Sequence, residues 1–530
     1  MSESLLQAFS GVLGDLRVLL IIVAAAIYGI FLGAVPGLTA TMAVALLVPA
    51  TFFLDPIPAL AAVVTVEACA IFAGDIPNAL LRIPGTPASA AYADDVYAFT
   101  RAGRSAEVLG VCLTFSVAGG VLGTVILALF APQLARITTW FSVAEYFWLY
   151  LLGLSSAVIV SRGSTWKAAL ALIIGLFLST VGLSAVHGQA RFTFGQAELF
   201  QGVNFIPAMI GLFGVSEVFR NILTYDFAAT TPGSQAGGPF SPPRSWKQRL
   251  AESVRSVFGA SLPLLWIRRW HAIRSGMMGS LIGMLPGAGA DIAAWVSLAV
   301  SKRFSPKPEE YGAGSMEGVS DASSANSGAL AGAWVPALVF GIPGDSVTAI
   351  VMGVLLMKNI KPGPEIFEKQ AVLVYSIFLI FFLANLLLIA AGFLAIKAGG
   401  YAVRIPRKVL LPVILLFCVI GSYAINGSYF DIGAMLAMGG LGFALERRRI
   451  PLGPVVLGII LGGPLEERFM QTLSSSESAW EAFFSRPMAA ALGVASLLVW
   501  LAPLVISLRQ PRRLLKSVSA RLRRLRQGSS

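Results

Sequence analysis

The stretch GAVPGLTATM (residues 33–42) lies inside an apolar run that begins near Val18 and continues past Leu47. Pro36 has no backbone N–H and biases the residue before it away from helix, and Gly37 permits a sharp turn. In a bilayer such a break is tolerated only where protein or a water-filled cavity satisfies the freed backbone groups. The stretch therefore predicts a broken membrane helix beside a functional cavity.

The composition is that of a membrane protein. Of 530 residues, 56% are hydrophobic and 12% are charged, whereas a soluble domain carries about 25% charged residues. The net charge is +12, and the collection of Lys and Arg in cytoplasmic loops accounts for this excess better than nucleic-acid binding does. We therefore expect an all-α polytopic membrane protein that contacts the lipid bilayer and has no nucleic-acid partner.

One polar segment separates two apolar halves. Its Pro-, Gly- and Ser-rich start and basic end predict a cytoplasmic linker followed by an amphipathic surface helix. We expect a first transmembrane repeat over 1–224, the linker over 225–270, a second repeat with a final span over 271–508, and a basic cytoplasmic tail over 509–530. The apolar runs predict about 11–14 membrane segments, given roughly 20 residues for each full span.

Each half carries two Pro-Gly breaks in apolar surroundings. They read AVPGLTA (34–40), RIPGTPASA (82–90), MLPGAGA (284–290) and GIPGDSVTA (341–349). Paired interruptions at corresponding positions of two halves indicate the binding site of a secondary transporter. We therefore expect two inverted repeats with broken helices or re-entrant hairpins, and alternating access around a site at mid-membrane.

A helix that restarts after a break exposes free N–H groups and the positive end of its dipole, which suits a carboxylate. Small and hydroxylated residues near the breaks can hydrogen-bond a ligand without adding charge. For Asn326, which begins an apolar run, helix N-capping is the alternative role. The predicted substrate-binding residues are Gly37, Leu38, Thr39, Thr41, Gly85, Thr86, Ser89, Gly287, Ala288, Gly289, Ala290, Asn326, Gly344, Ser346 and Thr348.

Five acidic residues are candidates for coupling a cation to transport, because ionisable residues in membrane segments are costly and usually functional. They are Asp291, Asp345, Asp75, Asp95 and Glu67. Helix capping is the alternative for the first two, and a hinge cap for Asp75. We expect no catalytic residue, no metal site and no cofactor beyond the coupling cation, Na+ or H+. The two histidines lack metal-ligand partners at useful spacing, and no P-loop is present.

A series of motifs runs along the chain in one order: PGLTATMAVALLVP (36–49), IPGTPASAA (83–91), ARFTFG (190–195), GLFGVSEV (211–218), GMLPGAGADIA (283–293), GAGSMEGV (312–319), GIPGDSVTA (341–349), KPGPEIF (361–367) and PLGPVVLGIILG (451–462). In these motifs the sequence resembles the large membrane subunit of the tripartite tricarboxylate transporters, the TctA family. The resemblance implies a secondary active transporter of the bacterial inner membrane that takes up an organic carboxylate, driven by a sodium or proton gradient. It implies two protein partners, a small membrane subunit (TctB-like) and a periplasmic solute-binding protein (TctC-like).

The chain departs from the pattern of that family at positions near the expected site. A stretch that usually resembles YGGSI reads FAGDI (72–76), and one that usually resembles EAANNA reads SSANSG (323–328), so Ser323 stands at the place of the acid. These departures leave the substrate and the coupling ion open. The alternative function is a stand-alone organic-anion symporter or exporter without a binding protein. An intramembrane enzyme or a channel explains the paired breaks less well.

Overall fold

The computed structural model describes residues 2–161, 164–184, 188–223, 246–287, 289–402, 407–475 and 481–508. Before the linker the chain forms α1 (Ser2–Leu13), α2 (Leu16–Ala34), α3 (Ala40–Thr51), α4 (Pro56–Ala73), α5 (Asp75–Leu81), η1 (Ser89–Tyr92), α6 (Ala93–Arg101), α7 (Ser105–Thr138), α8 (Val143–Val160), α9 (Thr165–Ser179), the antiparallel strands β1 (Gly182–Leu183) and β2 (Ala190–Arg191), η2 (Ala197–Gln201), α10 (Phe205–Met209), the π-helical η3 (Ile210–Val215) and α11 (Ser216–Leu223).

The rest of the chain is helical as well. It forms α12 (Trp246–Ile267), α13 (Arg269–Gly283), α14 (Gly289–Phe304), η4 (Pro308–Glu310), α15 (Met316–Phe340), α16 (Ser346–Met357), α17 (Ile366–Lys369), α18 (Ala371–Ala402), α19 (Arg407–Asn426), α20 (Tyr429–Arg447), α21 (Leu452–Ser474), η5 (Glu481–Phe483) and α22 (Pro487–Leu508).

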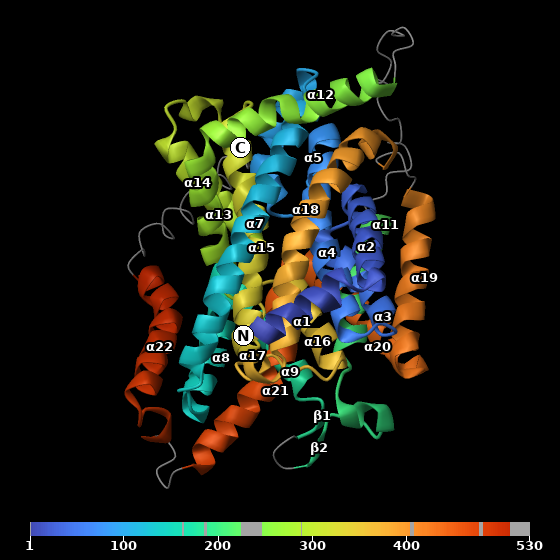
Figure 1. The fold of residues 1–530 in the computed structure, drawn as a ribbon. Coiled ribbons are helices and arrows are strands. Elements are labelled where there is room, and N and C mark those ends of the chain that lie inside the picture. Colours follow the sequence, from blue (N-terminus) through green and yellow to red (C-terminus); the bar gives the residue numbers. More distant parts are fainter. Residues whose placement is uncertain are drawn as a thin grey trace, which may run out of the picture.

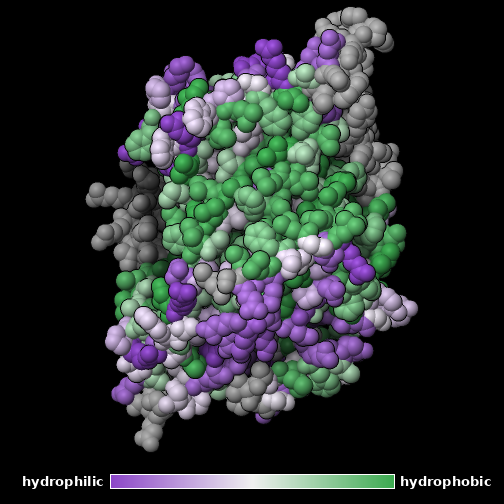
Figure 2. Space-filling model, in the orientation of Figure 1, coloured by the Kyte–Doolittle hydropathy of each residue, from purple (hydrophilic) through white to green (hydrophobic). Residues whose placement is uncertain are grey.

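An apolar band crosses the middle of the molecule, and more polar surfaces bound it at both ends (Figure 2). This is the surface that a bilayer requires. Within the described ranges, the helices long and apolar enough to span are Leu16–Ala34, Pro56–Leu81, Ser105–Thr138, Val143–Val160, Phe205–Leu223 and Ala371–Gly399. Five shorter apolar helices of 10–17 residues accompany them. The chain is thus an all-α polytopic membrane protein, which confirms the expectation from composition.

The first and third Pro-Gly breaks each turn the chain through a glycine in the left-handed conformation. Gly37, at φ 89°, separates α2 from α3, and Gly287, at φ 83°, separates α13 from α14. A residue with a Cβ is strained at these angles. Both helix breaks expected from the sequence are therefore confirmed, and each depends on its glycine.

The second and fourth breaks share a different turn. The N–H of Ile83 donates to the carbonyl of Pro77 at 3.3 Å, and the N–H of Ile342 donates to the carbonyl of Pro336 at 3.2 Å. In both cases the residue before the isoleucine has a positive φ, as in a helix C-terminal cap. These turns end α5 and α15, and the two halves of the chain thus use the same pair of turn types in the same order.

Glycines let the helix before the first break, and the helix before the third, lie directly on a neighbouring helix. A Cβ on Gly33 of α2 would lie 2.5 Å from the carbonyl oxygen of Ala70 on α4. A Cβ on Gly283 of α13 would lie 2.2 Å from the carbonyl oxygen of Ala329 on α15. Any larger residue would push these pairs apart, so the glycines fix where the breaks emerge.

The two long helices α7 and α18 pack against each other in antiparallel directions. Gly120 of α7 faces Asn385 of α18, while Leu113 faces Gly392, so positions that ascend along one helix meet positions that descend along the other. α12 packs on α7 and α1 packs on α18. α12 crosses one end of the bundle, and α1 lies nearer the other end (Figure 1).

α12 occupies the place of the expected surface helix, whereas residues 225–245 of the linker and the basic tail 509–530 lie outside the described residues. The N-capping alternative for Asn326 is wrong, because Asn326 lies well inside α15, which begins at Met316. The polar stretch before the apolar run is therefore helical, and α15 is buried along almost its whole length.

Candidate functional site

Segments from all four Pro-Gly breaks line one cavity with a volume of about 320 Å³. Thr39 and Thr41 come from the first break, Thr86 from the second, Gly287 from the third and Ser346 from the fourth. Three further predicted residues lie in its wall, namely Asp291, Asn326 and Asp345.

The third and fourth breaks touch through their backbones. The N–H of Gly287 donates to the carbonyl oxygen of Gly344 at 2.8 Å. A Cβ on Gly289 would lie 2.4 Å from the Cβ of Asp345, and a Cβ on Gly344 would lie 2.7 Å from the Cα of Ala333 on α15. The starts of α14 and α16 are therefore held side by side at the cavity.

The second break is fixed by an equivalent glycine contact. A Cβ on Gly85 would lie 2.4 Å from the Cα of Gly74, and the N–H of Gly85 donates to the carbonyl of Gly74 at 3.2 Å. Trp295 of α14 donates its indole N–H to the carbonyl of Pro87 at 3.1 Å. This contact joins the second break to the helix that follows the third.

The first break faces α11. Thr39 caps α3, with its Oγ1 accepting the N–H of Met42 at 3.2 Å. The side-chain amide of Asn221 donates to the carbonyl oxygen of Gly37 at 3.4 Å and to the carboxylate of Glu217 at 2.7 Å. Through these bonds α11 brings charged groups to the cavity. The π-helical η3 precedes α11, and such turns are frequent at functional sites.

Charged side chains in the wall are mostly acidic. Among the described residues the acids are Asp291, Asp345, Glu217 and Glu446, and the positively charged residue is Arg220. The guanidinium of Arg220 lies 2.5 Å from the carboxylate of Glu217 and 3.9 Å from that of Glu446. The positive charge of Arg220 is thus matched by protein acids before a ligand enters.

Three neutral polar side chains of the wall make no hydrogen bond to any described residue. They are Thr41 on α3, Asn326 on α15 and Ser346 on α16. Asn326 is only 2% exposed. A buried amide without a partner costs roughly 1–3 kcal/mol, so these groups are available to a ligand.

Several predicted binding residues support the turns and do not form the cavity wall. Leu38 and Ser89 are buried, and Ser89 exchanges hydrogen bonds with Thr86 at 3.0 and 3.1 Å. The N–H of Thr348 donates to the carboxylate of Asp345 at 2.8 Å, which caps α16. Ala288 lies outside the described residues, and only the backbone of Ala290 is described. The turns themselves contain Gly37, Gly85 and Gly344, and Gly289 begins α14.

Three of the five candidate coupling acids lie away from the cavity wall. Glu67 of α4 is buried and accepts the indole N–H of Trp334 at 3.0 Å. Asp75 of α5 accepts the hydroxyl of Tyr92 at 2.7 Å. Asp95 of α6 accepts three backbone N–H groups from the loop before α15 at 2.7, 2.9 and 2.9 Å. Of the five candidates, Asp291 and Asp345 are the two that lie in the wall of the cavity.

The two departures from the expected family pattern meet in one buried cluster. The hydroxyl of Tyr92 donates to Asp75 and also has Ser323 of α15 as a side-chain neighbour. Cys112 of α7 neighbours both Asp75 and Ser323. All four side chains are buried. Asp75 of α5 therefore brings a carboxyl group to the cluster that contains Ser323, the position at which the family resemblance leads us to expect an acid.

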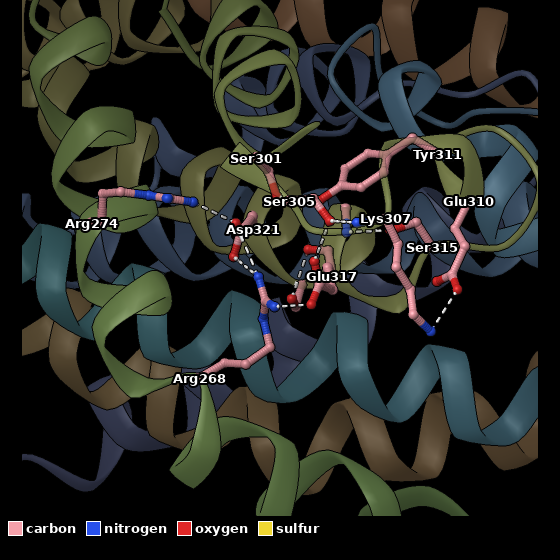
Figure 3. Close-up of polar contacts among 12 residues, drawn as sticks. Arg268, Arg274, Ser301, Ser305, Lys307, Glu310, Tyr311, Ser315, Glu317 and Asp321 are labelled. Carbon is pink, nitrogen blue, oxygen red and sulfur yellow. Dashed lines mark hydrogen bonds and ion pairs between the residues drawn. The ribbon is translucent and has the colours of Figure 1, made fainter. Parts of the chain in front are cut away.

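A second polar cluster lies outside the cavity and joins α13, α14 and α15 (Figure 3). The fully buried carboxylate of Asp321 lies 2.6 Å from the guanidinium of Arg274 and 3.4 Å from that of Arg268. Arg268 also lies 2.7 Å from Glu317, and Ser297 of α14 donates to the carbonyl of Asp321 at 3.1 Å. Among the described residues, no three His, Cys, Asp or Glu side chains gather as metal ligands would.

Sequence reasoning missed the charged residues that α11 and α20 bring to the wall. Glu217 lies in the GLFGVSEV motif and Arg220 follows three residues later, at the end of an apolar run. An ionisable pair inside such a run is a signal that could have selected them. Glu446 carries no such local signal, because its place at the cavity depends on the packing of α20 against α11 and η3.

Broken helices that surround a polar cavity within an apolar band define a polytopic membrane protein with the architecture of a transporter. The sequence matches the family described as tripartite tricarboxylate transporter TctA over residues 19–457. The chain therefore belongs to the TctA family of transporter membrane subunits, as the sequence motifs predict.

Two relatives come from Agrobacterium vitis. The "uncharacterized 52.8 kDa protein in TAR-I ttuC' 3'region" is 34% identical over 484 residues, which cover 91% of this chain and 92% of that protein. The "uncharacterized protein in TAR-II ttuC' 3'region" is 35% identical over 234 residues, which cover 44% of this chain and 97% of that protein. No solved structure is significantly similar to the chain.

Proposed function

We propose that this protein is the large membrane subunit of a binding-protein-dependent importer for an organic carboxylate, placed in the bacterial inner membrane. The observation that carries the proposal is the meeting of all four Pro-Gly breaks at one polar cavity. The starts of α3, α14 and α16 lie at this cavity, and helix starts supply N–H donors and positive dipole ends for a carboxylate.

We propose that the site works by alternating access between two inverted repeats. The paired contacts support this: Gly85 packs on Gly74 and Gly344 on Ala333, each eleven positions earlier in its own half. The antiparallel packing of α7 and α18, with α12 and α1 toward opposite ends, also supports it (Figure 1). In folds of this kind the two repeats rock around a fixed mid-membrane site.

We assign cation coupling, by Na+ or H+, to Asp291 and Asp345. Both carboxylates lie in the wall of the cavity, where a bound cation or proton offsets the repulsion between these acids and a substrate anion. In this account Glu67, Asp75 and Asp95 serve the packing of the surrounding helices.

The function is tested by uptake into cells that express the full chain with the genes for a small membrane subunit and a periplasmic binding protein. A panel of labelled organic acids is offered under separately imposed sodium and proton gradients. We expect gradient-dependent uptake of one acid class that requires all three proteins. Equal uptake by this chain alone would instead favour a stand-alone symporter, and uptake of no acid under either gradient would contradict the proposal.

A further inference from the structure

The charged side chains around the cavity disfavour the binding of a multiply charged anion. In the described part of the wall the basic side chain is that of Arg220, and it already pairs with Glu217 and Glu446. Asp291 and Asp345 add two further acids. A trianion would therefore meet more acidic than basic side chains in this wall.

The remaining positive potential comes from the backbone. Each helix start is equivalent to roughly +0.5 elementary charge, so the starts of α3, α14 and α16 together supply about one and a half. Asp345 caps α16 and offsets part of this potential. Asp291 in the first turn of α14 offsets a further part. Once the coupling cation or proton proposed above neutralises these acids, the helix starts can hold one carboxylate of a ligand.

Neutral hydrogen-bonding groups dominate the rest of the polar wall. Thr41, Asn326 and Ser346 come from three different helices and make no hydrogen bond to the described residues. Asn326 offers both a donor and an acceptor while 2% exposed. A site with such groups favours a ligand that satisfies them and rejects an analogue that leaves them unpaired.

We propose that the cavity is selective for a small hydroxylated monocarboxylate, an acid with one carboxylate and several hydroxyl groups. The carboxylate binds at the helix starts, and the hydroxyls pair with Thr41, Asn326 and Ser346. The cavity volume of about 320 Å³ lies at the small end of the range for ligand sites, about 300–1,000 Å³. This inference rests on the proposed function and narrows its substrate class.

A matched series of six-carbon acids tests the inference on the full chain in lipid nanodiscs, by calorimetry or scintillation proximity. Gluconate has one carboxylate and several hydroxyls, hexanoate has one carboxylate and no hydroxyl, and tricarballylate has three carboxylates and no hydroxyl. We expect gluconate to bind at least about tenfold more tightly than either, a difference of about 1.4 kcal/mol. Asn326→Ala and Thr41→Val should remove most of this preference, whereas Thr139→Val, at the exposed position that follows α7, should leave it unchanged.

The outcomes distinguish failure of this inference from failure of the proposed function. Tightest binding of tricarballylate would overturn the charge argument, and equal binding of hexanoate and gluconate would overturn the role of the hydroxyls. In both cases, loss of that binding in the Gly287→Val variant would still support the proposed carboxylate transporter. Binding of none of these acids would overturn both proposals.

Discussion

The backbone N–H of Gly287 donates a hydrogen bond to the carbonyl oxygen of Gly344 at 2.8 Å. These residues are far apart in the chain and belong to different Pro-Gly breaks. The bond holds the start of α14 beside the start of α16. The cavity therefore depends on backbone contacts that a side chain at either glycine would disturb.

Gly287→Val should abolish uptake while the protein still reaches the membrane. Gly287 has φ 83°, and its Cβ would lie 2.5 Å from the Cα of Ala157. Backbone strain of this kind costs on the order of 1–3 kcal/mol. Uptake and membrane abundance are measured together, with Gly433→Val as the control, since nothing lies within 4 Å of a Cβ there. Near-normal uptake by Gly287→Val would count against the site.

Asp291→Asn should change the dependence of uptake on the cation or on pH, because it removes one of the two acids that the third and fourth breaks bring to the cavity. Initial uptake rates are compared across sodium concentrations and external pH values. Asp94→Asn is the control, since Asp94 is an exposed acid paired with Arg82. An unchanged ion dependence would remove Asp291 from the coupling site.

Asp75→Ser should destabilise the protein by about 1–3 kcal/mol, because it removes the acceptor of the buried Tyr92 hydroxyl. The double variant Asp75→Ser, Ser323→Glu should recover part of that loss, since it returns a carboxylate to the same cluster from α15. Thermal unfolding in detergent measures both variants. A double variant no more stable than Asp75→Ser would contradict the shared location.

Asp321→Ala should destabilise by about 3 kcal/mol, because it leaves the guanidinium of Arg274 without its carboxylate partner and leaves Arg268 with Glu317 alone. Asp94→Ala breaks an exposed ion pair and should cost less than about 1 kcal/mol. Unfolding temperatures of the two variants are compared. Equal shifts would show that the cluster of Figure 3 contributes no more than a surface pair.

The helix breaks could be predicted from sequence because proline and glycine act locally. Pro36 and Gly37 end α2 whatever surrounds them, and Thr39 caps α3 by a bond to its own helix. The same holds for the other three breaks. Their convergence on one cavity followed from the pairing of breaks between the two halves, which a single broken helix would not have suggested.

The rest of the site depends on packing between distant segments. Glu217 and Arg220 face the cavity because η3 and α11 pack on α20, and no local pattern specifies that contact. Asp95 looked like a membrane acid but accepts backbone N–H groups from a loop about 220 residues later. A hydropathy pattern gives the depth of such residues poorly and their partners not at all.

The central claim is that four chain breaks from both halves enclose one solute. Its most direct test is protection of single cysteines placed at Thr41, Thr86, Asn326 and Ser346, after replacement of the buried native residues Cys69, Cys112 and Cys418. Labelling by a water-soluble thiol reagent is measured with and without the transported acid. We predict that a saturating concentration of the acid protects all four positions and leaves a cysteine at Thr139 unaffected. Protection of positions in only one half, or of none, would contradict the account.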